Sequence, residues 1–190
     1  MDGCCSEGHK LFALVAYLPE PLAGFVDALR EELSPGCRLR AHITILPPRE
    51  LSCGQEAAAT QIQKILTQAH HFRVALGNVK IFNVSEVVHL EVGTGLEQVR
   101  ELHGLFNRGV CKANELWDFE PHVTLAQELE PPDIPAAFDL AARRWREYSG
   151  PRGFTLDRLT FVSRSASAGD ATHDCWEDLA TWELPVAVLA

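Results

Sequence analysis

Two short stretches of this chain, His42-Ile43-Thr44-Ile45-Leu46 and His122-Val123-Thr124-Leu125-Ala126, repeat one pattern. In each, a histidine is followed by a β-branched residue, a threonine and an aliphatic residue. β-branched and aliphatic side chains favour strands, and successive side chains of a strand point to opposite faces. The histidine and the threonine therefore share one face, and the aliphatic residues on the other face suit a core. The repeat predicts two strands, each presenting an imidazole beside a hydroxyl.

The rest of the chain predicts further elements around these two strands. Apolar and β-branched runs predict strands, and apolar residues at helical spacing predict helices. The predicted strands cover residues 11–18, 40–46, 72–82, 87–92, 122–126, 154–162 and 175–184. The predicted helices cover residues 21–33, 55–69, 96–107 and 133–148. We expect Pro47-Pro48 to close the second strand.

This order of elements predicts one α+β domain over residues 1–190, with residues 1–10 as a flexible N-terminus. No Ser/Gly-rich linker separates the two halves, each of which carries one copy of the His-x-Thr pattern. If a pseudo-twofold axis relates the two halves as lobes, both imidazole–hydroxyl pairs can face one cleft.

Composition and charge exclude several classes of protein. Hydrophobic residues make up 46% of the chain, but no apolar run approaches the roughly 20 residues that a membrane-spanning helix needs. Lys and Arg number 17 against 26 Asp and Glu, a formal net charge of −9. Proteins that grip long nucleic acids usually carry a basic surface. A long duplex is therefore excluded as a partner, whereas a nucleotide or an RNA terminus is not.

The cysteines and the N-terminus favour a cytoplasmic protein, which we expect to be a monomer without a bound metal. The six cysteines form no CxxC pair and no disulfide framework, so we expect Cys37, Cys53 and Cys111 to be reduced thiols. Asp2 and Glu7 give the segment before residues 11–18 the wrong charge for a secretory leader. His70-His71 and His173-x-Cys175 lack the spacing and the carboxylates of known metal sites.

Two imidazoles and two hydroxyls around one cleft suit the chemistry of phosphodiesters. A neutral histidine can take a proton from water while a protonated histidine gives one to the leaving oxygen. Imidazole fits both roles because its ordinary pKa of about 6.5 lets both forms exist near neutral pH. The threonine hydroxyls can donate to the non-bridging phosphate oxygens. The sequence does not say which histidine is the base.

The paired His-x-Thr-aliphatic motifs resemble those of the 2H phosphoesterase superfamily, in particular its LigT-like group of RNA 2′,3′-cyclic phosphodiesterases and 2′-5′ RNA ligase-like proteins. The resemblance extends from about Leu11 to about Leu184. It implies a bilobal fold in which two pseudo-twofold-related lobes, each an antiparallel sheet with helices, flank a central cleft. It also implies a metal-independent reaction that opens a 2′,3′-cyclic phosphate on a nucleotide or RNA end.

The resemblance assigns roles to four residues of this sequence. His42 and His122 would be the catalytic acid and base, and Thr44 and Thr124 would bind the phosphate. Two other functions stay open. The same four side chains suit cleavage or ligation of 2′-5′-linked oligonucleotides, and they also suit a protein that binds RNA ends without chemistry.

Several further residues have a functional and a structural interpretation. Arg40, two residues before His42, is either a phosphate ligand or a charge at the edge of a strand, and the corresponding Glu120 has the opposite charge. A symmetric phosphate clamp is therefore in doubt. Tyr17, Phe82 and Trp117 could stack on a base, although aromatic residues at such places more often belong to the core. His89 could border the cleft but is more often a structural residue of its strand, and Arg164 could reach the phosphate or lie in a solvated loop.

Overall fold

The computed structural model describes residues 10–37, 39–165 and 176–186 and contains two four-stranded antiparallel sheets. The first sheet has the strand order β2-β1-β7-β8, and the second has the order β5-β4-β3-β6. The strands of the first sheet are β1 (Lys10–Tyr17), β2 (His42–Arg49), β7 (Arg158–Ser165) and β8 (Trp176–Glu183). Those of the second are β3 (Phe72–Ile81), β4 (Val88–Val92), β5 (His122–Ala126) and β6 (Gly153–Leu156).

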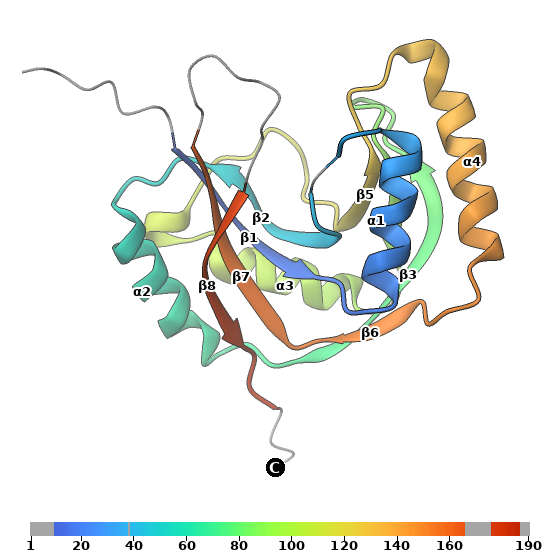
Figure 1. The fold of residues 1–190 in the computed structure, drawn as a ribbon. Helices are drawn as coiled ribbons and strands as arrows, with labels where there is room; N and C mark the ends of the chain where they lie inside the picture. The colour runs from blue at the N-terminus through green and yellow to red at the C-terminus, as the bar shows by residue number, and fades with distance from the viewer. Residues whose placement is uncertain (1–9, 38, 166–175, 187–190) are drawn as a thin grey trace, which may run out of the picture.

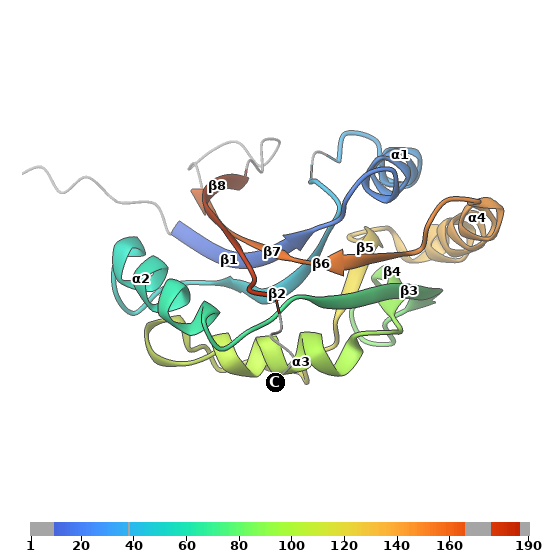
Figure 2. The same cartoon turned by 90° about the horizontal axis from the view of Figure 1, so that it is seen from below.

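Four α-helices pack around the sheets (Figures 1 and 2). They are α1 (Leu22–Leu33), α2 (Gln55–Leu66), α3 (Leu96–Phe106) and α4 (Ile134–Glu147), and short 3-10 turns cover Gly109–Cys111 and Pro131–Asp133. Helix α1 lies beside α4 and packs against β5, whereas α3 packs against β2. Each of the helices α1 and α3 therefore follows a strand of one sheet and contacts the other sheet. None of the helices in the described part of the chain is long and apolar enough to span a bilayer.

The two sheets are built on the same plan, which confirms the predicted two-lobed α+β fold. In each sheet a motif strand lies at the edge and pairs with a strand that precedes it by one helix, β1-α1-β2 in one lobe and β4-α3-β5 in the other. The lobes are nevertheless not the two halves of the chain. Both ends of the described chain contribute to the first sheet, and the middle of the chain forms the second.

Alternation along the two motif strands follows the prediction. Ile43 and Ile45 are fully buried, as are Val123 and Leu125, while the histidine and the threonine of each motif are half-buried. The aliphatic faces of both strands belong to one hydrophobic core, which they share with residues of α1, α3 and α4. Because this core lies behind both strands, the imidazoles and hydroxyls are left on the opposite faces.

Several predicted element boundaries differ from the structure. Pro47 and Pro48 do not end their strand, since β2 continues to Arg49. Strand β2 lies at the edge of its sheet, where a proline without an N–H group need not remove a ladder hydrogen bond. The predicted strand 154–162 is two strands in the structure. Strand β6, which ends at Leu156, pairs with β3 of the second sheet, and the following strand β7 pairs with β1 of the first sheet. Lys10 begins β1, and the rest of the predicted flexible N-terminus lies outside the described residues.

Candidate active site

The four motif side chains face a single cleft between the lobes. His42 and Thr44 from β2 and His122 and Thr124 from β5 all line it, and its volume is about 870 Å³. Strands β2 and β5 contact each other although they belong to different sheets. The segment before β5, residues 113–120, and the turn after β3, residues 82–85, form further walls. The convergence expected from the repeated pattern is therefore present.

Both histidines are held in the same way by the backbone. The Nδ1 atom of His42 lies 2.7 Å from the carbonyl oxygen of Arg40, and Nδ1 of His122 lies 2.7 Å from that of Glu120. A carbonyl oxygen only accepts hydrogen bonds, so Nδ1 of each ring is the donor. In the neutral form Nε2 is then the unprotonated nitrogen of each ring. Each imidazole can use Nε2 to accept or to donate a proton.

The electrostatic surroundings of the two histidines differ. Burial lowers the pKa of His42 to about 4, and the positive charges of Arg30 and Arg40 act in the same direction. Burial also lowers the pKa of His122, but there the carboxylate of Glu120 opposes the shift. His42 therefore binds a proton less readily than a histidine with an ordinary pKa. The negative charge of Glu120 favours the protonated form of His122.

Arg40 lies at the cleft but outside the strand. Strand β2 begins at His42, and the Arg40 guanidinium forms an ion pair with Asp178 at 3.0 Å. It also covers the ring of Tyr17 at 3.6 Å from the ring centroid, and the Tyr17 hydroxyl donates to Asp178 at 2.7 Å. Burial and then Asp178 raise the pKa of Tyr17 to about 12. These residues form a polar cluster beside His42, in which a carboxylate compensates the charge of Arg40.

An aromatic cluster lies beside the other histidine. Phe82 meets His122 edge-on with the ring centroids 4.9 Å apart, and it stacks on His89 at 3.9 Å. His89 is only 3% exposed and does not line the cleft, whereas Phe82 does. His89 is also the cross-strand partner of Thr124, while Thr44 has Val15 in that place. The structural interpretation of His89 therefore fits better than a direct substrate contact.

Two arginines of the cleft were not predicted from the sequence. Arg30 on α1 is 3% exposed and donates from Nη1 to the carbonyl oxygen of Leu39 at 2.9 Å. Its position four residues after the buried Val26 places it on the inner face of the helix, which was the available signal. Arg49, at the end of β2, is also buried and pairs with Glu115 at 2.7 Å. Its burial depends on partners distant in sequence and has no local signal.

The remaining residues predicted to contact the substrate also lie at the cleft. Tyr17, Trp117 and Arg164 line the cleft, and Arg164 lies 5.8 Å from the ring centroid of Trp176. Within the described residues, no group of three or more His, Cys, Asp or Glu side chains is placed to hold a metal ion. His173 and Cys175 lie outside those residues.

Comparison with known proteins finds a matching family model and several similar folds. Residues 18–168 match the family model described as the 2′-5′ RNA ligase superfamily. E. coli LigT has a similar structure, with a TM-score of 0.63 at 15% sequence identity over 95% of this chain and 99% of that one. E. coli LigT complexed with 3′-AMP gives 0.63 at 14% over 93% and 99%. Usb1 of Kluyveromyces marxianus gives 0.53 at 11% over 95% and 99%. Comparison with curated protein sequences finds no match.

Proposed function

The chain belongs to the 2′-5′ RNA ligase superfamily, a group of 2H phosphoesterases, and from this premise we propose that it is a metal-independent phosphodiesterase that opens a 2′,3′-cyclic phosphate on a nucleotide or RNA end. One observation carries the proposal. Two imidazoles, each fixed by a backbone carbonyl two residues upstream, line one cleft together with two threonine hydroxyls. The 3′-AMP complex of E. coli LigT supports a nucleotide as ligand.

In the proposed reaction His42 is the base and His122 the acid. The Nε2 atom of His42 takes a proton from water as the water oxygen bonds to phosphorus. The bond between phosphorus and one ribose oxygen breaks, and Nε2 of His122 gives its proton to that oxygen. The product is a phosphate monoester. Burial and nearby positive charges keep His42 neutral, and Glu120 favours protonated His122, which supports this division of roles.

Thr44 and Thr124 hold the phosphate in this proposal. Each hydroxyl projects from the same strand face as its histidine and lines the cleft. Donation from fixed hydroxyls to the non-bridging oxygens stabilises the negative charge that develops as phosphorus becomes five-coordinate. These proposed roles require that the hydroxyl groups of the threonines, and not only the size of their side chains, contribute to phosphate binding.

Replacing either threonine with valine should lower kcat/KM about 10- to 100-fold, since a hydrogen bond to a charged group contributes about 1.5–3 kcal/mol. Valine keeps the shape and the β-branching, so the strands should be retained. Steady-state kinetics on a cyclic-ended oligonucleotide measure the effect. Thr44→Ser and Thr124→Ser are the matched controls and should restore most of the rate. Wild-type kcat/KM in both valine variants would exclude phosphate binding by the hydroxyls.

The pH dependence of kcat/KM should be bell-shaped and displaced toward acid. The base must be neutral, so the rate should rise with pH through the His42 pKa of about 4. The acid must be protonated, so the rate should fall as pH rises through the lowered pKa of His122, below about 6.5. Initial rates at low substrate concentration from acid to alkaline pH check this. A rate that keeps rising above neutrality would contradict the assignment.

The substrate class is tested by incubating the purified protein, with EDTA present, with three kinds of compound. These are nucleoside 2′,3′-cyclic monophosphates, a short RNA with a cyclic end and a 2′-5′-linked oligonucleotide. We expect the cyclic phosphates to be converted to monoesters. Conversion of the 2′-5′-linked compound alone would favour the second function. That the protein is a monomer and that it acts in the cytoplasm both stay predictions.

A further inference from the structure

Exposed apolar side chains gather at the cleft. Among the described residues the large hydrophobic side chains that are strongly exposed are Val84 at 71%, Leu116 at 90%, Trp117 at 69% and Val186 at 66%. The first three line the cleft, and Val186 does not. Single exposed apolar residues are ordinary, but several around one cavity indicate a binding surface. We call Val84, Leu116 and Trp117 the apolar rim.

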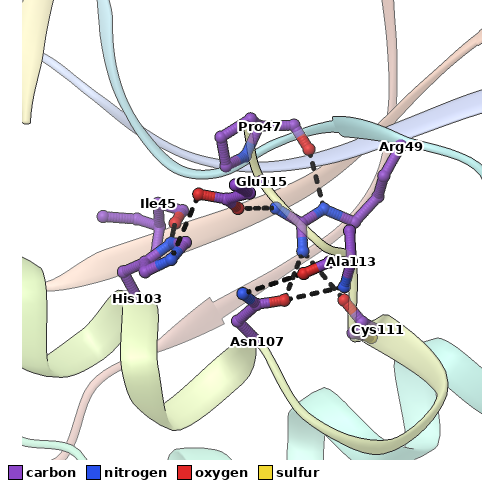
Figure 3. A network of polar contacts seen from close by, with 8 residues as sticks. All are labelled: Ile45, Pro47, Arg49, His103, Asn107, Cys111, Ala113 and Glu115. Atoms are coloured by element: carbon purple, nitrogen blue, oxygen red, sulfur yellow. Dashed lines mark hydrogen bonds and ion pairs between the residues drawn. The ribbon is translucent and has the colours of Figure 1, made fainter. Parts of the chain in front are cut away.

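A network of polar contacts holds the chain just before Leu116 and Trp117 in place (Figure 3). The buried Arg49 donates to Glu115 at 2.7 Å, to Asn107 at 2.8 Å and to the carbonyl oxygen of Cys111 at 2.9 Å. Asn107 in turn accepts from the backbone N–H of Ala113 at 2.9 Å. These bonds fix the chain on the N-terminal side of Leu116.

His103 of α3 contacts this segment both before Leu116 and after Trp117. The Nε2 atom of His103 lies 3.4 Å from Glu115, and Nδ1 lies 2.9 Å from the carbonyl oxygen of Ile45 in β2. The ring of His103 stacks on Phe119 at 3.9 Å between centroids. Glu115 and Phe119 bracket Leu116 and Trp117, so both apolar side chains are presented by a fixed backbone. Little ordering entropy is lost when a ligand covers such a surface.

The charges of the cleft do not suit a long polyanion. Arg30, Arg40, Arg49 and Arg164 line the cleft, and Arg40 and Arg49 are paired with the carboxylates of Asp178 and Glu115. Asp118 and Glu120 also line the cleft, and the chain as a whole carries a net charge of −9. Affinity for nucleic acids normally comes from many unpaired cations along the phosphate backbone. Apolar contact is a second source of affinity in this cleft, and aromatic side chains provide it by stacking on bases.

We infer that the apolar rim binds a nucleobase of the substrate, with Trp117 as the stacking platform and Leu116 and Val84 as its apolar flanks. The inference rests on the proposed function and deepens it. It makes the preferred substrate a short nucleotide end that is recognised by its base, in contrast to a long RNA that is recognised by its backbone.

The test compares a dinucleotide ending in a 2′,3′-cyclic phosphate with a counterpart that has methoxy groups in place of both bases. Trp117→Ser should raise KM for the base-bearing compound about tenfold and leave kcat nearly unchanged, because stacking contributes about 1–3 kcal/mol per base. Leu116→Ser, which removes an apolar flank and no stacking ring, should raise the same KM by a smaller factor. Neither variant should change KM for the compound without bases. Between about 50 and 200 mM salt, KM of the wild type should change far less than the 10³-fold or more seen with 6–10 phosphate contacts.

Val186→Ser is the matched control, since it removes an equally exposed apolar side chain outside the cleft and should leave all constants unchanged. Unchanged KM in both rim variants, with normal turnover, would overturn the inference and leave the proposed function standing. The same result together with dissociation of a dimer would assign the rim to a second copy of the chain. If the wild type turns over neither compound, the proposed function fails. In that case the rim is tested by binding of a dinucleotide containing 2-aminopurine, and equal binding by the wild type and the serine variants would overturn it.

Discussion

His42→Ala and His122→Ala should each lower kcat on a cyclic-ended RNA about a thousandfold. A positioned acid or base contributes typically 10²- to 10⁴-fold, and each variant removes one of the two. The double variant should be little worse than either single variant, because groups that act in one proton-transfer step are not additive. Rates are measured with EDTA present so that contaminating metal enzymes do not contribute.

His70→Ala is the control for this pair. His70 is exposed, follows α2 and does not line the cleft, so its replacement should leave kcat unchanged. Circular dichroism of all variants separates loss of chemistry from loss of fold. Wild-type turnover by folded His42→Ala would rule out the proposed base, and the same result for His122→Ala would rule out the proposed acid.

Arg49→Met should lower the free energy of unfolding by about 3–5 kcal/mol, the usual cost of removing one partner of a buried ion pair. The methionine removes the arginine partner of Glu115, the donor to the carbonyl oxygen of Cys111 and one of the two donors to the side chain of Asn107. Methionine fills similar space, so the effect reports the charge and the hydrogen bonds rather than a cavity. Urea titration followed by circular dichroism measures the change.

Arg144→Met provides the comparison on the surface. Arg144 makes two hydrogen bonds to the carboxylate of Glu32, but both of these side chains are solvent-exposed. Exposed ion pairs contribute little to stability because water and salt screen them. A loss in Arg49→Met no greater than that in Arg144→Met would show that the network behind the apolar rim does not stabilise the fold.

The motif strands and their faces could be predicted from the sequence because the information is local. Two residues of alternation determine that His42 and Thr44 share a face, and the repeat at His122 and Thr124 supplies the second strand. Pairing between strands is not local. Nothing near Leu156 signals that the chain changes sheets there, so one predicted strand became β6 and β7.

The surroundings of the site were harder to predict for the same reason. Arg40 lines the cleft beside His42, but Asp178, which pairs with it, lies far along the chain in β8. Arg30 and Arg49 line the cleft as buried cations, and burial of an arginine depends on tertiary partners. Sequence reasoning therefore identified the groups proposed to react, but neither the charges that distinguish the two histidines nor the network that holds the apolar rim.

The central claim is that His42 and His122 catalyse attack of water on the phosphorus of a cyclic phosphate. It is tested most directly by running the reaction with EDTA in water labelled with heavy oxygen and analysing the monoester by mass spectrometry. We predict that one labelled oxygen enters each phosphate and that His42→Ala and His122→Ala abolish the incorporation. Retention of a cyclic-ended RNA by the wild type without any labelled monoester would contradict the claim and identify a binding protein.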